Sequence, residues 1–124
     1  MRLERRKKAR AFGLRAETLA ALWLRFKFYE ILARNFAARG GEIDLIARRG
    51  DVIVFVEVKA RPTLDQAFLA IDAAKAARIS RVAALWLSAN RWAVGRIFRG
   101  DAIYIAPGRL PRHVEAAVPL DLFV

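Results

Sequence analysis

The sequence predicts a mixed α/β domain with a central sheet flanked by helices. Two observations support this fold class. An Ala- and Leu-rich segment precedes three short runs rich in β-branched residues, and a second helical segment separates these runs from one or two more. A chain of 124 residues has room for one domain with one core. The expected order is helix, three strands, helix, and one or two strands.

The N-terminal part is expected to consist of a basic arm and a buried helix. Residues 1–12 contain six Lys or Arg and one Glu, which predicts a mobile arm, so that the folded domain spans residues 13–124. From Gly13 to about Lys27 the sequence (LRAETLAALWLRFK after the glycine) favours a helix. Because this segment is apolar nearly all round, most of it is expected to be buried.

Three strands are expected to follow as a largely antiparallel meander. The predicted strands run from Phe28 to Phe36, from Glu42 to Ala47 and from Val52 to Ala60. Turn residues separate them at Arg39-Gly40-Gly41 and at Arg48-Arg49-Gly50-Asp51.

Pro62 ends the third strand and opens the second half of the chain. The pattern then predicts a helical region from about Leu64 to Ala89 with a break near Ile71-Asp72, a strand from Ile97 to Ile105, and a last short strand from Arg112 to Val118. Gly100 weakens the centre of the first of these two strands, and Pro107-Gly108 supplies the turn between them.

The strong positive charge points to a polyanionic partner. The chain carries a net charge of +11, of which the first 12 residues contribute +5 and the remainder +6. A field of this sign attracts nucleic acid, which releases its counterions on binding. We expect DNA in preference to RNA. A solubilising tail, an anionic membrane surface and a ribosomal partner are the alternatives, although no basic amphipathic helix of the membrane-surface kind stands out.

Other classes of protein are excluded by composition. Cysteine is absent, which rules out disulfides, thiolate catalysis and zinc–cysteine sites and is compatible with the cytoplasmic location that we expect. No apolar run reaches the roughly 18–20 residues of a membrane span. The basic start leads into no secretory apolar region, and Glu4 and the lack of serine argue against a mitochondrial presequence.

The third strand carries the residues that point to chemistry. Side chains alternate along a strand, so one face holds only valines and the other holds Ile53, Phe55, Glu57 and Lys59. The valine face, formed by Val52, Val54, Val56 and Val58, is expected to be buried. The carboxylate and the ammonium on the other face need a partner or solvent, because burying an unpaired charge is costly.

The second strand supplies another acid. If Arg49 and Gly50 form a two-residue hairpin loop, Glu42 lies opposite Glu57, and Asp44 and Glu57 become diagonal neighbours about 7–8 Å apart on one face. A three-residue loop would turn Asp44 to the far side of the sheet. The register therefore decides whether the two acids meet.

Two carboxylates beside a lysine suit metal-dependent hydrolysis of a phosphodiester. Carboxylate oxygens are ligands that Mg²⁺ or Mn²⁺ prefers, and the backbone carbonyl of Val58 can add another. Asp44 and Glu57 would hold the ion, while Lys59 would orient the attacking water or steady the developing charge. The alternative is an ordinary ion pair between Glu57 and Lys59, with Asp44 on an exposed rim.

Residues on the helices extend this candidate site. Glu17 shares an apolar, inward stripe with Leu14, Ala21 and Leu24, so it either supports the site or is a helix-end carboxylate stabilised by the helix dipole. Lys75, Arg78 and Arg81 form a basic stripe that either follows a phosphate backbone or is a solvated face with Asp72 paired to Lys75. We expect Trp86 in the core and a structural role for His113.

Around these residues the sequence resembles the YraN-like family of bacterial proteins, which have a restriction-endonuclease-like fold. The resemblance rests on Gly41–Ile46 (GEIDLI) and Val54–Lys59 (VFVEVK), with Arg61 just after. Weaker similarity at Glu17, Ile31–Asn35, Lys75 and Arg78 extends the likeness over about residues 13–118. Three residues depart from the family pattern: Ala16 and Phe28 stand where glycines are usual, and Gly100 interrupts an Arg-Phe-Asp sequence.

The resemblance implies the nuclease motif written PD-(D/E)xK. It implies Asp44 and Glu57 as metal ligands, Lys59 as the catalytic lysine and Glu17 as an auxiliary acid, in an enzyme acting on DNA, with branched or flapped DNA suggested by analogy alone. Nucleic-acid contacts are expected from Arg61, Lys75, Arg78 and Arg81. The alternative function is a binding module that keeps the fold without cutting.

Overall fold

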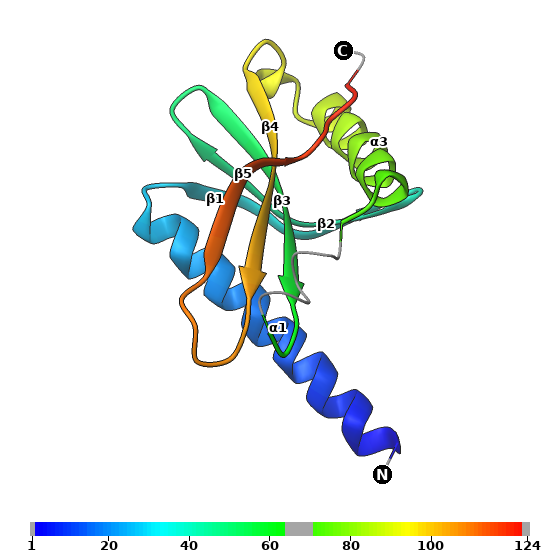
Figure 1. Cartoon of the computed structure of the whole chain (residues 1–124). Coiled ribbons are helices and arrows are strands. Elements are labelled where there is room, and N and C mark those ends of the chain that lie inside the picture. The colour runs from blue at the N-terminus through cyan, green and yellow to red at the C-terminus, as the bar shows by residue number, and fades with distance from the viewer. Residues whose placement is uncertain (1, 64–70, 123–124) are drawn as a thin grey trace.

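The computed structural model describes residues 2–63 and 71–122. These residues form α1 (Arg2–Phe26), β1 (Glu30–Ala38), β2 (Gly41–Arg49), β3 (Val52–Ala60), α3 (Ala73–Ala89), the 3-10 helix η1 (Arg91–Ala93), β4 (Ile97–Ile105) and β5 (Arg112–Val118) (Figure 1). The predicted order of helix, three strands, helix and further strands is confirmed, with two strands in the last part.

The strands of the described residues form one mixed sheet in the order β1-β2-β3-β4-β5. β1, β2 and β3 are antiparallel neighbours, β3 and β4 are parallel, and β5 is antiparallel to β4. A parallel pair requires a crossover connection, and α3 lies in the connection between β3 and β4. The predicted α/β class with a mixed sheet is therefore confirmed.

The two long helices cover opposite faces of the sheet (Figure 1). On one face, Ala20 and Leu24 of α1 pack with Leu45, Val54 and Val56. On the other face, α3 packs against β2 and β3, with Trp86 set edge-on to Phe55 at a centroid distance of 5.8 Å. The alternation predicted for β3 is confirmed, since its valines face α1 and its Ile53 and Phe55 face α3. Trp86 belongs to the core, as expected.

Helix α1 is longer than expected and is buried on one face only. It begins at Arg2, so the segment predicted to be a mobile arm continues the helix. Arg, Lys and Ala are good helix formers, and adding residues to an existing helix is much easier than nucleating a new one. The outer face of the C-terminal half is exposed at Leu19, Leu22 and Phe26, so the expected burial holds only for the face toward the sheet.

Helix α3 follows its predicted limits. Oδ1 of Asp72 accepts a hydrogen bond of 2.8 Å from the Lys75 backbone N–H and caps the helix, and Asn90 is its C-cap, as expected. The earlier part of the predicted helical region, residues 64–70, lies outside the described residues. Among the helices that the structure describes, none is both long and apolar enough to cross a membrane.

The hairpin between β2 and β3 differs from the predicted one by one turn position. The turn residues are Gly50 and Asp51 rather than Arg49 and Gly50, and Arg49 pairs with Val52. Gly50 adopts φ +60°. The two-residue turns whose twist matches that of the flanking strands require a positive φ at their first position. The register therefore shifts by two residues, and because two is the period of a strand, every side chain keeps its predicted face.

A buried carboxylate holds the last strand in place. Asp101 is fully buried and accepts hydrogen bonds from Arg99, from Nε2 of His113 at 2.7 Å and from the backbone N–H of Ala116. Burial alone would raise the pKa of Asp101, but the bonds from His113 and Arg99 lower it to about 2. Lys27 donates to Nδ1 of His113, which ties the end of α1 to β5 and supports the structural role expected of this histidine.

Gly100 is required where the sequence suggested a weakness. A Cβ atom at this position would collide with the carbonyl oxygen of Val118 in β5. β4 runs through Gly100 without interruption, and the register of β5 shifts there. The glycine therefore lets the two backbones approach closely.

The C-terminus of α1 contains a strained residue. Phe28 has φ +70°, a left-handed conformation that a residue with a Cβ adopts at a cost. The N–H of Tyr29 bonds to the carbonyl of Leu24 and that of Phe28 to the carbonyl of Arg25, which is a Schellman motif. Glycine is usual at this position of the motif, and Phe28 also stands where YraN-like proteins usually have glycine.

Replacing Phe28 by glycine is expected to stabilise the protein by about 1 kcal/mol, because glycine adopts positive φ without the steric cost. Phe28 is 87% exposed, so little apolar burial is lost. Urea denaturation would measure the free energy of unfolding. Phe28→Ala, which removes the ring but keeps the Cβ, should give no comparable gain; an equal gain in both variants would assign the effect to the ring.

Candidate active site

The candidate site begins where β2 separates from β3. The two strands pair from Arg49 with Val52 to Leu45 with Val56, whereas β3 stays paired with β4 as far as Ala60. Past Leu45, the side chain of Asp44 takes the place of the strand backbone, since its Oδ2 accepts a 2.8 Å hydrogen bond from the N–H of Val58. Continued by one residue, the observed register puts Asp44 across from Glu57 rather than diagonal to it.

Two pockets meet at this separation. One, of about 540 Å³, extends toward α1 and is lined by residues that include Glu17, Lys59 and Arg61. The other, of about 300 Å³, extends toward α3 and includes Glu42 and Arg78. Asp44, Glu57 and Lys75 line both pockets. We call the two pockets together the acidic cleft.

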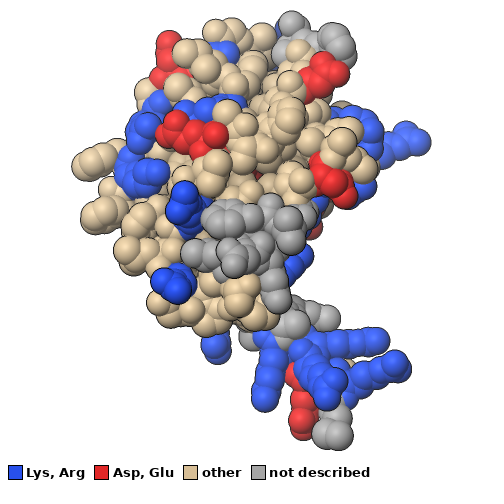
Figure 2. Space-filling view, viewed as in Figure 1, with Lys and Arg blue, Asp and Glu red and all other residues tan. Residues whose placement is uncertain are grey.

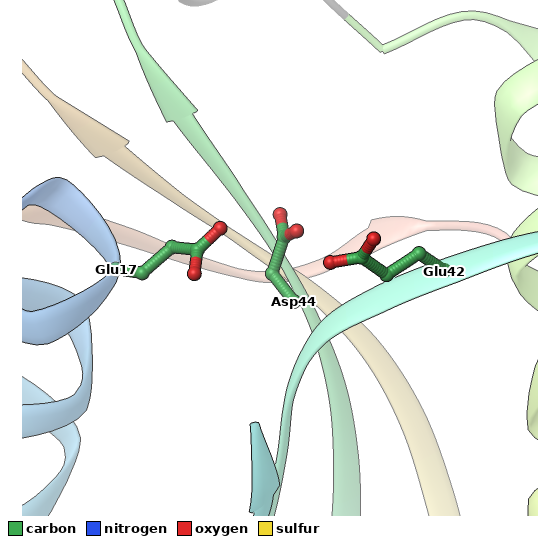
Figure 3. A group of neighbouring side chains, drawn as sticks. All are labelled: Glu17, Glu42 and Asp44. Atoms are coloured by element: carbon green, nitrogen blue, oxygen red, sulfur yellow. The ribbon is translucent and has the colours of Figure 1, made fainter. Parts of the chain in front are cut away.

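Three carboxylates converge in the acidic cleft. Glu17 projects from α1, Glu42 and Asp44 project from β2, and the side chain of Asp44 lies between the other two (Figure 3). One carboxylate oxygen from each lies within 4.8 Å of those of the others. This grouping is compact enough for the three residues to bind a single metal ion.

Glu57 is engaged differently from these three acids. It is only 4% exposed, and its Oε1 lies 2.6 Å from Nζ of Lys75 and 3.3 Å from Nζ of Lys59. Two ammonium groups thus balance this buried carboxylate. The sequence predicted the pairing with Lys59 as one alternative, whereas Lys75 arrives from α3.

The carboxyl groups of Asp44 and Glu17 lack sufficient positive partners. Burial raises the pKa of Asp44 to about 7, with further contributions from the negative charges of Glu57 and Glu17. Burial also raises the pKa of Glu17, although a hydrogen bond from Asn35 opposes this rise. Oε2 of Glu17 is buried and has no hydrogen-bond partner within the described part of the chain. A hard divalent cation would relieve both deficits, so the residues present fit such an ion.

The pKa values of the two lysines in the acidic cleft are shifted in opposite directions. Burial and the neighbouring Lys75 lower the pKa of Lys59. Burial opposes the charge on Lys75 as well, but hydrogen bonds to Glu57 and Lys59 raise its pKa. Lys75 therefore keeps a fixed positive charge, while Lys59 releases its proton more easily than a lysine in water does.

The remaining predicted residues divide into two groups. Val58 and Arg61 line the pocket toward α1, and Arg78 lines the pocket toward α3. Arg81 lies apart from the acidic cleft, in an apolar groove that also includes Arg39 and Leu85. The ammonium of Lys75 contacts Glu57, so this residue does not present its charge on an outer stripe with Arg81.

Sequence reasoning did not include Glu42 among the site residues, and it included Lys75 as a nucleic-acid contact rather than as a partner of Glu57. Glu42 precedes Asp44 by two residues on a strand, so strand periodicity places both on one face, and that signal was present in the sequence. The contact of Lys75 with Glu57 left no such signal, because it depends on how α3 packs over β2 and β3. The predicted ion pair between Asp72 and Lys75 is replaced by a hydrogen bond, in which the backbone N–H of Lys75 donates to Asp72.

The sequence profile of the family described as Uncharacterised protein family UPF0102 matches residues 16–105, which is most of the chain. The chain belongs to the UPF0102 family. UPF0102 proteins of Methylorubrum extorquens and Methylobacterium nodulans are each 55% identical to it, over 94% and 88% of this chain and 91% and 84% of their own lengths. A UPF0102 protein of Bartonella quintana is 46% identical over 98% of this chain and 99% of its own length.

The resemblance noted in the sequence to YraN-like proteins agrees with membership of UPF0102. The segment matched to the UPF0102 family contains the charged residues of the acidic cleft on α1, β2, β3 and α3: Glu17, Glu42, Asp44, Glu57, Lys59, Arg61, Lys75 and Arg78. The charged residues of the acidic cleft therefore lie within the part of the chain that the family profile matches.

The raised pKa of Asp44 predicts a stability that falls with pH. The pKa of this carboxyl is 3.8 in the unfolded chain and about 7 in the folded protein. Between these two pH values the folded state keeps a proton that the unfolded state has lost. Stability is therefore expected to fall from about pH 4 to about pH 7 and to stay low above that range. Asp44→Asn should remove most of this slope, leaving the smaller contribution of Glu17, and should be more stable than wild type at pH 8 by a few kcal/mol in EDTA.

Urea denaturation at several pH values would measure this effect. Asp51→Asn, at an exposed position in the β2–β3 turn, is the matched control and should keep the wild-type slope. An unchanged slope in Asp44→Asn would contradict the electrostatic account of the cleft. Added Mn²⁺ should stabilise wild type more than Asp44→Asn, because the ion binds the ionised carboxylate.

Lys75→Met is expected to destabilise the metal-free protein by about 1–3 kcal/mol, because removing one partner leaves Glu57 less well balanced. The effect should be moderate, since Lys59 still contacts Glu57 and Lys75 is partly exposed. Arg78→Met, on an exposed position of the same helix, is the control. Thermal or urea unfolding in EDTA measures both, and an equal loss would show that Lys75 has no special role.

Proposed function

We propose that the protein is a metal-dependent phosphodiesterase that cleaves nucleic acid, DNA in preference to RNA, as PD-(D/E)xK nucleases do. The observation that carries this proposal is the acidic cleft. Three carboxylates converge within 4.8 Å beside a buried Glu57 and Lys59, and two of these carboxyl groups are poorly balanced without a cation.

Glu17, Glu42 and Asp44 are the residues that would hold Mg²⁺ or Mn²⁺. Glu57 and the backbone carbonyl of Val58 adjoin them as further ligands of the PD-(D/E)xK pattern. Bound there, such an ion would polarise the scissile phosphate and acidify a water molecule. The donor set is all oxygen, which suits these hard cations better than zinc or copper.

The lysines would divide the remaining work. Lys59 releases its proton more readily than an ordinary lysine, so it is suited to orient the attacking water and to exchange a proton with it. Lys75 keeps its charge and holds Glu57 in place. Arg61 and Arg78 line the cleft and would contact flanking phosphates.

Charge supports nucleic acid as the substrate. The net charge of +11 attracts a polyanion from a distance, whereas the acidic cleft itself repels a phosphate until a cation neutralises it. Together these two fields would make entry of the substrate depend on metal. Branched or flapped DNA is included among the candidate substrates only because resolvases share the proposed arrangement.

A second candidate function has one observation in its favour. Glu57 already has two ammonium partners, which is the arrangement expected of a structural ion pair. A nucleic-acid-binding module that keeps the fold without cutting would bind through the basic surface, and the acidic cleft would have no catalytic role.

Cleavage assays separate these candidates. Labelled single-stranded, duplex and four-way DNA, and single-stranded RNA, would be incubated with the protein and either Mn²⁺ or EDTA. We expect cleavage with Mn²⁺ only, and a loss of about 100-fold or more in Asp44→Asn and in Lys59→Met. Asp51→Asn, distant from the cleft, should cut at the wild-type rate. Binding without cutting of any substrate would favour the binding module.

A further inference from the structure

The face of α1 that lines the acidic cleft continues past the cleft. Phe12, Gly13, Ala16 and Glu17 line the pocket toward α1. Successive residues of a helix are rotated by about 100°, so residues with that same direction recur three, four and seven positions earlier. By this periodicity, Arg2, Arg5 and Arg6 extend the cleft-lining face, whereas Glu4 and Lys7 point to the opposite side.

This part of α1 is free of packing within the described residues. Residues 2–8 are all exposed. The N-terminal end of the helix projects beyond the sheet (Figure 1), and Figure 2 shows basic side chains gathered on that projecting end. Because Arg2, Arg5 and Arg6 are exposed, their packing adds little to the stability of the fold, and their mutual repulsion opposes helix formation. A polyanion along this face would relieve that repulsion.

We propose that Arg2, Arg5 and Arg6 form a phosphate-binding tract along α1. The tract would bind the part of a duplex DNA that extends out of the acidic cleft. This inference rests on the proposed function, since it takes the cleft as the place where the strand is held. Guanidinium groups suit the role because each can donate two parallel hydrogen bonds to a phosphate. The lone acid of the segment, Glu4, lies on the side away from the tract.

A membrane surface fits this segment less well than DNA does. A helix that binds the lipid interface carries large apolar side chains along one face beside its cations. Among residues 2–8, only Leu3 is apolar. The alignment of the arginines with the cleft, rather than with an apolar stripe, favours a partner that also enters the cleft.

The tract sets a length for the substrate. At 1.5 Å per residue, Arg6 and Arg2 lie about 16 and 22 Å from Glu17 along the helix axis. One strand of a duplex advances about 3.4 Å per nucleotide, so the tract would contact phosphates about five to seven nucleotides from the site. The protein would therefore require a duplex arm of that length on one side.

The helix offers its own matched control. Arg5→Gln/Arg6→Gln removes two charges from the tract, and Lys7→Gln/Lys8→Gln removes two from the same turns but mainly outside it. With Mn²⁺, and in a Lys59→Met background that prevents cutting, fluorescence anisotropy with a hairpin of about 14 base pairs should show about tenfold weaker binding for the arginine variant than for the lysine variant, and a salt slope smaller by about 1.8. On a stem of about 4 base pairs, too short to span cleft and tract, the difference should vanish.

Equal losses in the two double variants on the hairpin of about 14 base pairs would overturn the tract, because the binding would then depend only on the total positive charge of the helix. Circular dichroism would confirm that both variants keep equal helix content. Binding and cleavage are measured separately, so the two proposals fail separately. If the arginine variant binds more weakly but wild type cuts nothing with Mn²⁺, the tract stands and the nuclease proposal falls. If DNA is cut but both variants bind alike, only the tract falls.

Discussion

The main physical constraint on this structure is the balance of the charges that meet in the acidic cleft. Among the described residues, four carboxylates, those of Glu17, Glu42, Asp44 and Glu57, share the cleft with the ammonium groups of Lys59 and Lys75. Fully ionised, these six groups carry a formal charge of −2. A proton on Asp44 reduces this charge, and burial together with the negative charges of Glu57 and Glu17 raises the pKa of Asp44 to about 7. A divalent cation would cancel the charge of these six groups, and the exposed Arg61 and Arg78, which also line the cleft, add further positive charge.

Like charges stay close only if rigid elements hold them. Asp44 is fixed by the N–H of Val58, so the sheet itself positions this acid at the point where its two strands separate. Glu17 is fixed by the packing of Ala20, Ala21 and Leu24 on the valine face of β3. Lys75 is fixed by the capped first turn of α3. These three residues are thus positioned by apolar packing or backbone bonding nearby, whereas Glu57 is held by its two ammonium neighbours.

Much of this arrangement was accessible from the sequence because it follows from local periodicity. Alternation along β3 predicted which side chains face α1, and the Gly-rich turns predicted the meander. The hairpin register was wrong by one turn position, yet its error was a multiple of the strand period, so Asp44 kept its side of the sheet. The N-terminal arm was expected to be irregular, and its helical form depends on a helix that already exists behind it.

What the sequence did not reveal depends on tertiary contact. No spacing rule connects Lys75 with Glu57, or Asp101 with His113 and Ala116. The sequence indicates only that Gly100 weakens a strand. The need for a glycine follows from the close approach of the Val118 backbone in β5, which no sequence pattern reveals. Strained backbone at Phe28 was signalled only by comparison with a pattern in which glycine is usual.

The hydrogen bonds of Asp101 have a consequence for how the protein emerges from the ribosome. Its partners include His113 and Ala116, and His113 in turn holds Lys27 at the end of α1. Until β5 has been synthesised, Asp101 lacks these two donors, and the end of α1 is held only by its packing on the sheet and by the hydrogen bond from Arg49 to the carbonyl of Lys27. The nascent chain can therefore pack α1 on β3 and bring the acids of the cleft together before β5 is made, and translation of the last strand adds the second attachment of the end of α1.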